Sequence, residues 1–246
     1  VGDVLPPAGG EVVHDHHLVA PGEEGLGHVR ADEARPSGHD RPHAHYPTAS
    51  VFVTFEGLDG SGKSTQAELL EAYLAARGRE VVRTREPGGT PLGEAIRRLL
   101  LEGPEMTAWA EAALFAAARA ELAERVIRPA LARGADVVCD RYLDSSLAYQ
   151  GVARGLGIDA VLALNVAVAD LLPDRTFLLV LDPVSSAARL GDEPDRIERA
   201  GDGFRTAVAE GYRVVAERYP ERIKTIDATL PVEEIAAIVR AYLPDA

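Results

Sequence analysis

The chain has 246 residues, of which 46% are hydrophobic and 26% charged, enough to build the core of one large domain or of two small ones. Its net charge of −13 argues against a general nucleic-acid-binding role, because binding along a phosphate backbone needs a basic surface. A single cysteine, Cys139, leaves no internal disulfide bond to form, which favours a reducing compartment such as the cytoplasm. No apolar run reaches the roughly 18 residues that a membrane span needs.

The first 48 residues differ in composition from the rest of the chain. They contain all seven histidines, and their prolines and glycines interrupt every periodic pattern. We therefore predict a disordered extension over residues 1–48 and a folded domain over residues 49–246. The chain begins with valine, and we expect the working protein to begin near Ser50. A solvated tail is the simpler interpretation of the extension, and the alternative is a metal site at its closest histidines, His14, His16 and His17.

From Val51 onward, short apolar runs alternate with helical patterns. The apolar runs predict five strands, at Val51–Glu56, Glu80–Arg85, Asp136–Cys139, Thr176–Asp182 and Arg222–Ile226. Because strands that alternate with helices form parallel sheets, we predict an α/β fold of three layers, a five-stranded parallel sheet with helices on both faces. The loops that follow the strands then share one edge of the sheet, where ligands bind.

The segments between these strands carry helical periodicity. The predicted helices are Ser64–Arg77, Leu92–Leu101, Thr107–Arg133, Leu143–Gly151, Ile158–Asp170, Pro183–Leu190, 203–219 and Val232–Tyr242.

The most informative motif follows the first predicted strand. Residues 57–65 read GLDGSGKST, the P-loop pattern G-x-x-x-x-G-K-[ST] between a strand and a helix. Its glycines let backbone N–H groups turn toward an anion, and the helix N-terminus adds partial positive charge. Lys63 can reach the β and γ phosphates, and the Ser64 hydroxyl can bind Mg²⁺. The predicted ATP site comprises Gly57, Leu58, Asp59, Gly60, Ser61, Gly62, Lys63, Ser64 and Thr65.

Arginines occur in the loops that follow three of the strands. Arg85 and Arg141 each lie just past a strand, and a third, charged stretch contains Arg189, Arg196 and Arg199. Since the carboxyl ends of parallel strands meet at one edge, these loops should reach the P-loop. Guanidinium groups bind phosphate bidentately, so Arg85 and Arg141 are candidate phosphate ligands.

Further motifs occur in a characteristic order after the P-loop. They are TREPGGT at 84–90, LFAAAR at 114–119, DRYLDSSLAYQG at 140–151, DRIE at 195–198 and IDA at 226–228. Together with the P-loop they resemble the bacterial thymidylate kinases, over roughly four-fifths of the chain. The block at 140–151 is the most specific, because a P-loop alone would indicate only a superfamily.

The resemblance implies that ATP phosphorylates dTMP to dTDP with the help of Mg²⁺, as a step of dTTP synthesis, in a cytoplasmic homodimer. It places Ser64 at the metal and gives Asp140 a link to the metal through water. Asp59 would accept the 3′-hydroxyl of the deoxyribose or lie near the metal.

The resemblance also implies an acceptor site. Arg85 and Arg141 would hold the acceptor phosphate, while Phe115 would stack on thymine and Arg119 would donate to a thymine carbonyl. Tyr149 would press against the sugar and exclude a 2′-hydroxyl. Hydroxyl and amide groups toward the base or nucleotide would come from Ser145, Ser146 and Gln150.

A lid over the phosphates, here at about residues 185–203, is a further implication. Family members whose P-loop lacks arginine, as at Gly60 here, take their catalytic arginines from the lid. Arg196 is the first candidate for that role and Arg189 the second. The predicted catalytic set is thus Lys63, Arg141, Asp59, Arg196 and Arg189.

Two alternatives remain open from the residues alone. One is a kinase for another nucleoside monophosphate such as dUMP, and the other is a non-catalytic P-loop protein that only binds nucleotides. A regulatory GTPase is disfavoured, because lysine occurs only at 63 and 224 and neither lies in a guanine-reading Asn-Lys-x-Asp motif.

Overall fold

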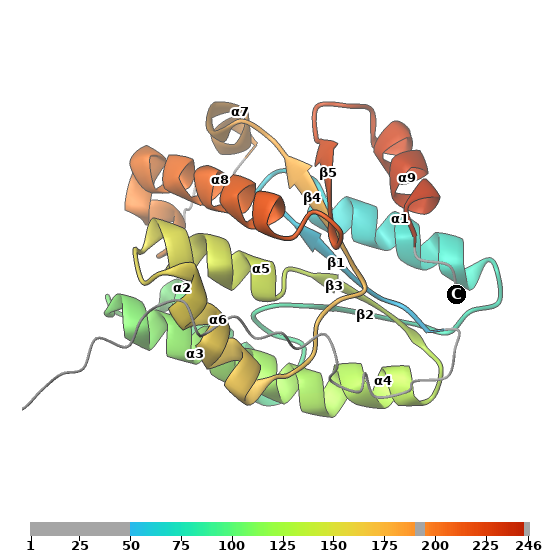
Figure 1. Ribbon diagram of the computed structural model, residues 1–246, viewed down its shortest axis with the longest axis horizontal. Coiled ribbons are helices and arrows are strands. Elements are labelled where there is room, and N and C mark those ends of the chain that lie inside the picture. Colours follow the sequence, from blue (N-terminus) through green and yellow to red (C-terminus); the bar gives the residue numbers. More distant parts are fainter. Residues whose placement is uncertain (1–49, 190–194, 244–246) are drawn as a thin grey trace, which may run out of the picture. The chain divides into compact units, whose positions relative to one another are not determined.

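The computed structural model describes residues 50–189 and 195–243. These residues contain a five-stranded parallel sheet in the order β2-β3-β1-β4-β5, which confirms the predicted α/β fold (Figure 1). The predicted extension at residues 1–48, with its histidines, and residues 190–194 of the predicted lid lie outside the described residues.

The strands lie close to their predicted positions. They are β1 (Phe52–Glu56), β2 (Val81–Arg85), β3 (Asp136–Asp140), β4 (Arg175–Val180) and β5 (Ile223–Asp227). Phe55 of β1 is level with Asp140 of β3, and Asp140 is level with Arg85 of β2. The loops that follow β1, β2 and β3 therefore start side by side on one edge of the sheet.

Helical segments connect the strands. They are α1 (Lys63–Ala75), α2 (Pro91–Glu102), α3 (Ala108–Leu122), η1 (Ala123–Ile127), α4 (Arg128–Ala132), α5 (Leu143–Ser146), η2 (Leu147–Ala153), α6 (Ile158–Val168), α7 (Pro183–Ala188), η3 (Glu198–Ala200), α8 (Gly201–Arg218) and α9 (Val232–Ala241). Within residues 50–189 and 195–243, none of them has the length and apolar character needed to cross a membrane.

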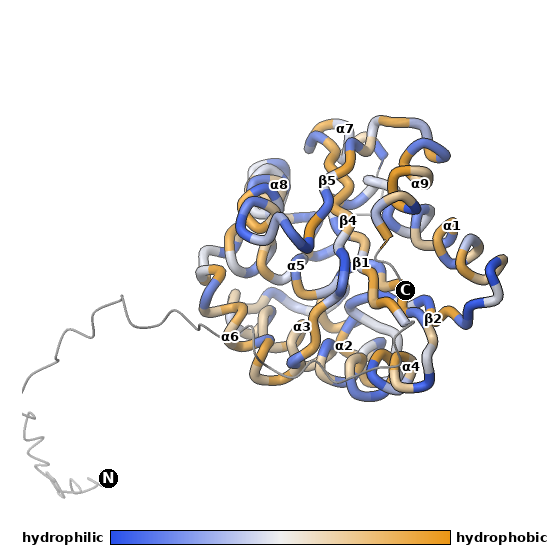
Figure 2. Tube along the Cα trace, turned by 45° about the vertical axis from the view of Figure 1, so that its right-hand side comes forward, coloured by the Kyte–Doolittle hydropathy of each residue, from blue (hydrophilic) through white to orange (hydrophobic). Residues whose placement is uncertain are grey.

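Two hydrophobic clusters fill the space on the two faces of the sheet. Val53 and Phe177 pack on one face with α1 and α9, which lie together on one side of the strands in Figure 1. Phe52 and Leu178, one position away in each strand, point to the opposite face, where α3, η2 and α8 contribute to the core. Figure 2 shows β4 in the hydrophobic colour, as expected for a strand that is covered on both faces.

Two predicted helices are less regular than expected. The predicted helix Thr107–Arg133 contains the π-helical stretch η1 between α3 and α4. Pro129 lies just after this stretch and has no N–H for an intrahelical bond, and its ring crowds the carbonyl four residues earlier, so the helix widens there. The predicted helix Leu143–Gly151 likewise passes from α5 into the π-helical η2. Gly211 of α8 lies so close that a Cβ there would be 2.7 Å from the Ala148 carbonyl oxygen.

Candidate active site

The P-loop runs from the end of β1 to the start of α1 and needs its glycines. A Cβ at Gly57 would lie 2.3 Å from the Leu179 carbonyl oxygen, so only glycine fits there. Gly60 and Gly62 have φ values of 77° and 94°, the left-handed region that glycine adopts without strain. This path brings the first N–H groups of α1 to the edge of the sheet, where they can bind an anion.

Lys63 lies buried across the base of this loop. Its Nζ donates to the Leu58 carbonyl oxygen at 2.8 Å and lies 3.7 Å from Asp59 Oδ1. Burial and the positive charge of Arg141 lower the pKa of Lys63 to about 8, against the opposing effect of nearby carboxylates. The ammonium group is thus poorly solvated in the free protein, and phosphate oxygens would compensate its charge.

Ser64 and Asp140 meet at the same edge. The Ser64 Oγ donates to Asp140 Oδ2 at 2.6 Å, and the two residues come from α1 and the end of β3. Both groups present oxygen, the ligand atom that Mg²⁺ prefers. Among the described residues, no group of three or more His, Cys, Asp or Glu side chains could hold a metal ion. A metal at this pair would therefore need phosphate oxygens or water as its other ligands.

Asp59, at the crest of the P-loop, pairs with Arg141 in the loop after β3. Arg141 Nη2 donates to Asp59 Oδ1 at 2.6 Å. Burial raises the pKa of Asp59, but the charges of Arg141 and Lys63 outweigh it and bring the pKa to about 2. Arg141 has a φ of 69°, the only positive value among described non-glycine residues. The surrounding structure holds this strained backbone, and bonds to Asp59, Ser145 and Tyr212 position the guanidinium group in the ligand-free protein.

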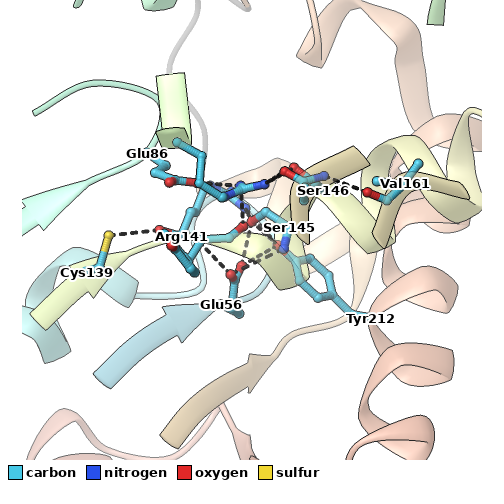
Figure 3. Close-up of polar contacts among 11 residues, drawn as sticks. Glu56, Glu86, Cys139, Arg141, Ser145, Ser146, Val161 and Tyr212 are labelled. Atoms are coloured by element: carbon cyan, nitrogen blue, oxygen red, sulfur yellow. Dashed lines mark hydrogen bonds and ion pairs between the residues drawn. The ribbon is translucent and has the colours of Figure 1, made fainter. Parts of the chain in front are cut away.

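Glu56, the last residue of β1, supports Arg141 from below (Figure 3). Its carboxylate accepts bonds from Tyr142 N at 2.7 Å, Ser145 Oγ at 2.5 Å and Tyr212 OH at 3.0 Å. Arg141 Nη1 donates in turn to the Tyr212 hydroxyl at 2.9 Å. Burial, followed by the charge of a nearby carboxylate, raises the pKa of Glu56 to about 7. Glu56 was not among the predicted site residues, although a charged side chain at the end of a buried strand is itself a signal of function.

The predicted roles of Ser145 and Ser146 toward the base are not met in this structure. The Ser145 hydroxyl donates to Glu56 and accepts from Arg141 Nη1 at 3.2 Å, so it holds the Arg141 side chain in place. Ser146 is buried, and its Oγ accepts from Arg119 Nη1 at 3.1 Å. The short turn α5 directs both hydroxyls into the protein.

Arg119 also differs from its prediction. It is 1% exposed, and all five of its N–H groups donate within the protein. The acceptors are Glu86 Oε2 for Nε and Nη2, the Tyr142 carbonyl oxygen for Nη2, and Ser146 Oγ and Asn165 Oδ1 for Nη1. The expected donor to a thymine carbonyl is therefore not free, because the ion pair with Glu86 and three neutral acceptors engage the whole guanidinium group. A base could reach it only by displacing one of these acceptors.

Phe115 lies one helical turn before Arg119 on α3 and is half-buried. It packs beside the cluster of Ile96, Leu100 and Ala118, and the rest of its ring is accessible. This placement is compatible with the predicted stacking on a base.

Two further arginines, Arg85 and Arg97, are close enough for their charges to act on each other, and the charge of Arg141 also acts on Arg97. Arg85 ends β2, is exposed, and donates to Glu94 Oε1 at 2.9 Å. Arg97, on α2, donates to the Pro87 carbonyl oxygen at 3.0 Å. Burial and the charge of Arg85 lower the pKa of Arg97, and its own charge acts on Asp59. Arg97 was not predicted, because a helical arginine two residues before three leucines looks like an ordinary surface charge.

Tyr149 lies in an aromatic group beside the P-loop. Its ring faces the Arg141 guanidinium at 5.4 Å and meets the rings of Phe204 at 6.2 Å and Tyr212 at 6.1 Å. A small hollow, which we call the acceptor hollow, opens next to it. Its lining comprises Leu58, Asp59, Tyr149, Ser186, Ile197, Glu198, Gly201, Phe204, Arg205 and Val208. Gln150 does not face this hollow: it is 1% exposed and donates to Glu111.

The two predicted lid arginines have opposite environments. Arg196, the first candidate, is 3% exposed and donates to the Leu100 carbonyl oxygen at 2.7 Å and to Glu111 Oε2 at 2.8 Å. Its guanidinium group is therefore held by α2 and α3 in the ligand-free structure, and its place as the first catalytic arginine stays a prediction that would require these bonds to break. Arg189 is exposed, and its Nη1 donates to the Gly60 carbonyl oxygen of the P-loop at 3.2 Å.

A family model described as thymidylate kinase matches residues 55–239 of the chain. The match begins in β1 and ends in α9, so it includes the P-loop, the loop after β3 and the helices that carry Phe115 and Arg97.

Similar proteins support the same relationship. A thymidylate kinase of Symbiobacterium thermophilum is 51% identical over 200 residues, which cover 80% of this chain and 94% of that protein. A thymidylate kinase of Bifidobacterium longum is 49% identical over 201 residues, covering 79% and 98%. The crystal structure of the thymidylate kinase from Ehrlichia chaffeensis matches with a TM-score of 0.65 and 34% identity, covering 78% of this chain and 97% of that one.

Proposed function

The chain belongs to the thymidylate kinase family, and on that premise we propose that it transfers the γ-phosphoryl group of ATP to dTMP, giving ADP and dTDP. The observation that carries this proposal is the contact between Arg141 and Asp59 at 2.6 Å. It joins Arg141 to the P-loop itself, so an acceptor phosphate that Arg141 held would lie beside the γ-phosphate of ATP.

The acceptor needs little chemical activation. The phosphate of a nucleoside monophosphate has its second pKa at about 6, so at neutral pH it is mostly dianionic and can attack without a general base. The difficulty is to bring two anions into line, which requires positioning and charge compensation. Arg141 and Arg97 supply positive charge on the acceptor side, and Lys63 supplies it on the ATP side. Phe115 would stack on the base.

Mg²⁺ is proposed as the metal, with the Ser64 hydroxyl as a ligand and Asp140 holding the metal's water shell. The donor set fits, because both groups present oxygen and already lie 2.6 Å apart. When bound, the ion would neutralise charge on the β and γ phosphates.

Arg189 is the proposed source of positive charge toward the γ-phosphate. It reaches over Gly60, and the helix that carries it is joined to the P-loop, since Ser186 Oγ donates to the Asp59 carbonyl oxygen at 2.7 Å. An arginine in this place would stabilise charge that develops during transfer.

A homodimer is proposed from an unpaired apolar surface. On α3 the residues Ala113 and Ala117 are exposed, and on α6 so are Ala163 and Ala167. Figure 2 shows α6 mostly in the hydrophobic colour, although it lies at the surface. A second copy that covers this surface would remove it from water. A cytoplasmic location is proposed as well, because the one cysteine is a free, buried thiol.

The decisive experiment measures ADP formation from ATP and Mg²⁺ with dTMP, dUMP, CMP, AMP and GMP as separate acceptors. The proposed function requires the largest kcat/KM with dTMP. A larger value with another nucleotide would assign the enzyme to that acceptor. ADP formation that no acceptor stimulates would leave a P-loop protein without this kinase activity.

A further inference from the structure

The buried carboxylate of Glu111, which makes no bond to the P-loop, holds several segments of the chain together. Glu111 lies on α3, one helical turn before Phe115, and is 1% exposed. Its Oε1 accepts from Gln150 Nε2 at 3.0 Å and from Arg154 Nε at 3.2 Å. Its Oε2 accepts from Arg154 Nη2 at 3.1 Å and from Arg196 Nη2 at 2.8 Å. Burial raises the pKa of Glu111, but these hydrogen bonds outweigh that effect and hold it below its ordinary value.

The first connection runs through Arg196 to one wall of the acceptor hollow. Besides its bond to Glu111, Arg196 donates from its main-chain N to the Leu101 carbonyl oxygen at 2.8 Å, so α2 and α3 both hold it. Ile197 and Glu198 follow directly and line the acceptor hollow. Asp195 Oδ1 accepts from the main-chain N–H groups of Ile197 and Glu198, and the bonds of Arg196 tie this turn to α2 and α3.

The second connection runs through Arg154 to another wall. The Arg154 guanidinium lies 4.2 Å from the ring centre of Phe204. Phe204 lines the same hollow and contacts the ring of Tyr149. Both connections from Glu111 thus end at the acceptor hollow, and neither passes through Lys63 or the glycines of the P-loop.

We propose that Glu111 is a positioning residue for the acceptor nucleotide. Through Arg196 and Arg154 it fixes two walls of the acceptor hollow against α3, the helix that carries Phe115. The inference rests on the proposed function, and it adds that the acceptor occupies the hollow that Asp59 and Tyr149 line. Loss of the carboxylate would loosen the acceptor side and leave the ATP side unchanged.

Buried ion pairs can also serve stability alone, so the test needs a matched control. Asp136 provides one: it is 0% exposed and pairs with Arg79, which is 26% exposed, whereas Glu111 is 1% exposed and pairs with Arg154, which is 25% exposed. Asp136 begins β3, at the end of the sheet away from the P-loop. The comparison is between Glu111→Gln and Asp136→Asn.

Steady-state kinetics of both variants would separate the two roles. Glu111→Gln should raise the KM for dTMP about tenfold, as expected for a lost hydrogen bond to a charged group, and keep kcat and the KM for ATP within about twofold. Asp136→Asn should lower the melting temperature without changing either KM. Equal KM values for dTMP in the two variants, or equal increases for dTMP and ATP in Glu111→Gln, would overturn the proposal.

A milder variant keeps the test possible if Glu111→Gln does not fold. Arg154→Gln removes one connection at a partly exposed position and should raise the KM for dTMP about threefold, with the KM for ATP unchanged. An unchanged KM for dTMP in that variant would also reject the inference. The wild-type assay with dTMP decides the proposed function beforehand, so failure of the function and failure of the inference are distinguishable.

Discussion

Asp59 and Arg141 are 82 residues apart in the chain, yet their side chains form a hydrogen-bonded ion pair of 2.6 Å at the crest of the P-loop. The pair joins the loop after β1 to the loop after β3, and Glu56 and Tyr212 hold Arg141 from the protein side. The acceptor side of the site is therefore built in the ligand-free protein.

The geometry of Arg141 leads to the first prediction. Arg141→Lys retains one positive charge but loses the fork that bonds Asp59, Ser145 and Tyr212, so kcat/KM for dTMP should fall about 10- to 100-fold. Steady-state kinetics with varied dTMP would measure this. Arg133→Lys, at an exposed pair with Glu80, is the control and should behave as wild type. Unchanged kinetics in Arg141→Lys would argue against a bidentate role.

Substitutions of Arg189 and Arg196, which lie on either side of residues 190–194, should have different effects, one on activity and the other on stability. Arg189→Ala should lower kcat about a hundredfold or more with little change in the KM for ATP, because its charge acts mainly in the transition state. Arg196→Ala should instead lower the free energy of unfolding by about 3 kcal/mol, since it breaks a buried pair with Glu111. Urea denaturation and kcat measured on both variants test this assignment. A large loss of kcat in Arg196→Ala at unchanged KM for dTMP would reverse it.

Phe115 should contribute to the binding of dTMP and not to the binding of ATP. Stacking of an aromatic ring on a base contributes about 1–3 kcal/mol, so Phe115→Ala should raise the KM for dTMP about tenfold or more. Leu114→Ala is the matched control, because Leu114 is also partly buried against the cluster of Ile96, Leu100 and Ala118. Equal effects of the two substitutions would show that Phe115 serves packing alone.

Because the pKa of Lys63 is lowered, we predict that activity falls and the stability of the folded chain increases as the pH rises. Its pKa in the folded chain is about 8, below the ordinary value of 10.5, so its ammonium group is lost as the pH rises through 8. The kcat/KM for ATP should fall over that range. Between pH 8 and pH 10.5 this lysine is protonated in the unfolded chain and mostly neutral in the folded chain. The unfolded chain therefore binds more protons, and the contribution of Lys63 makes the folded state more stable as the pH rises. A pH profile of kcat/KM for ATP that stays flat to pH 10 would contradict the assignment.

If the proposed dimer forms through α3 and α6, a charge placed on that surface should halve the mass of the particle in solution. Ala163→Glu places a charge on the apolar surface of α3 and α6, and it should convert a dimer into single chains in sedimentation velocity experiments. Ala237→Glu, at an exposed position on α9, should leave the mass unchanged. Identical sedimentation of wild type and both variants would place any interface elsewhere.

Much of the ATP side could be predicted because it depends on local sequence. The P-loop needs nine consecutive residues, and Ser64 meets Asp140 because parallel strands end at one edge. The same rule brought Arg141 to Asp59. These relationships require only the order of the strands, which the alternation of apolar and helical segments predicts.

The environment of each arginine could not be predicted in this way. Arg119 is engaged by Glu86, 33 residues away, and Arg196 by Glu111, 85 residues away. A buried guanidinium group needs partners from several elements, and the sequence does not reveal which of them converge. Arg97 was not predicted for a different reason. It comes close to Asp59 only because of the way α2 packs, and the sequence does not show that packing. The π-helical turns were missed because they leave hydrophobic periodicity nearly unchanged.

The crowding at Gly60 has an evolutionary consequence. A Cβ at residue 60 would lie 2.9 Å from the Arg189 Cβ and 3.1 Å from the Ser186 carbonyl oxygen, so a side chain at position 60 would require the end of α7 to move. A lineage that acquired an arginine at position 60 could not retain Arg189 where it stands. These two positions are therefore expected to change as a pair among related sequences, and an ancestor of either type would resist single substitutions at both.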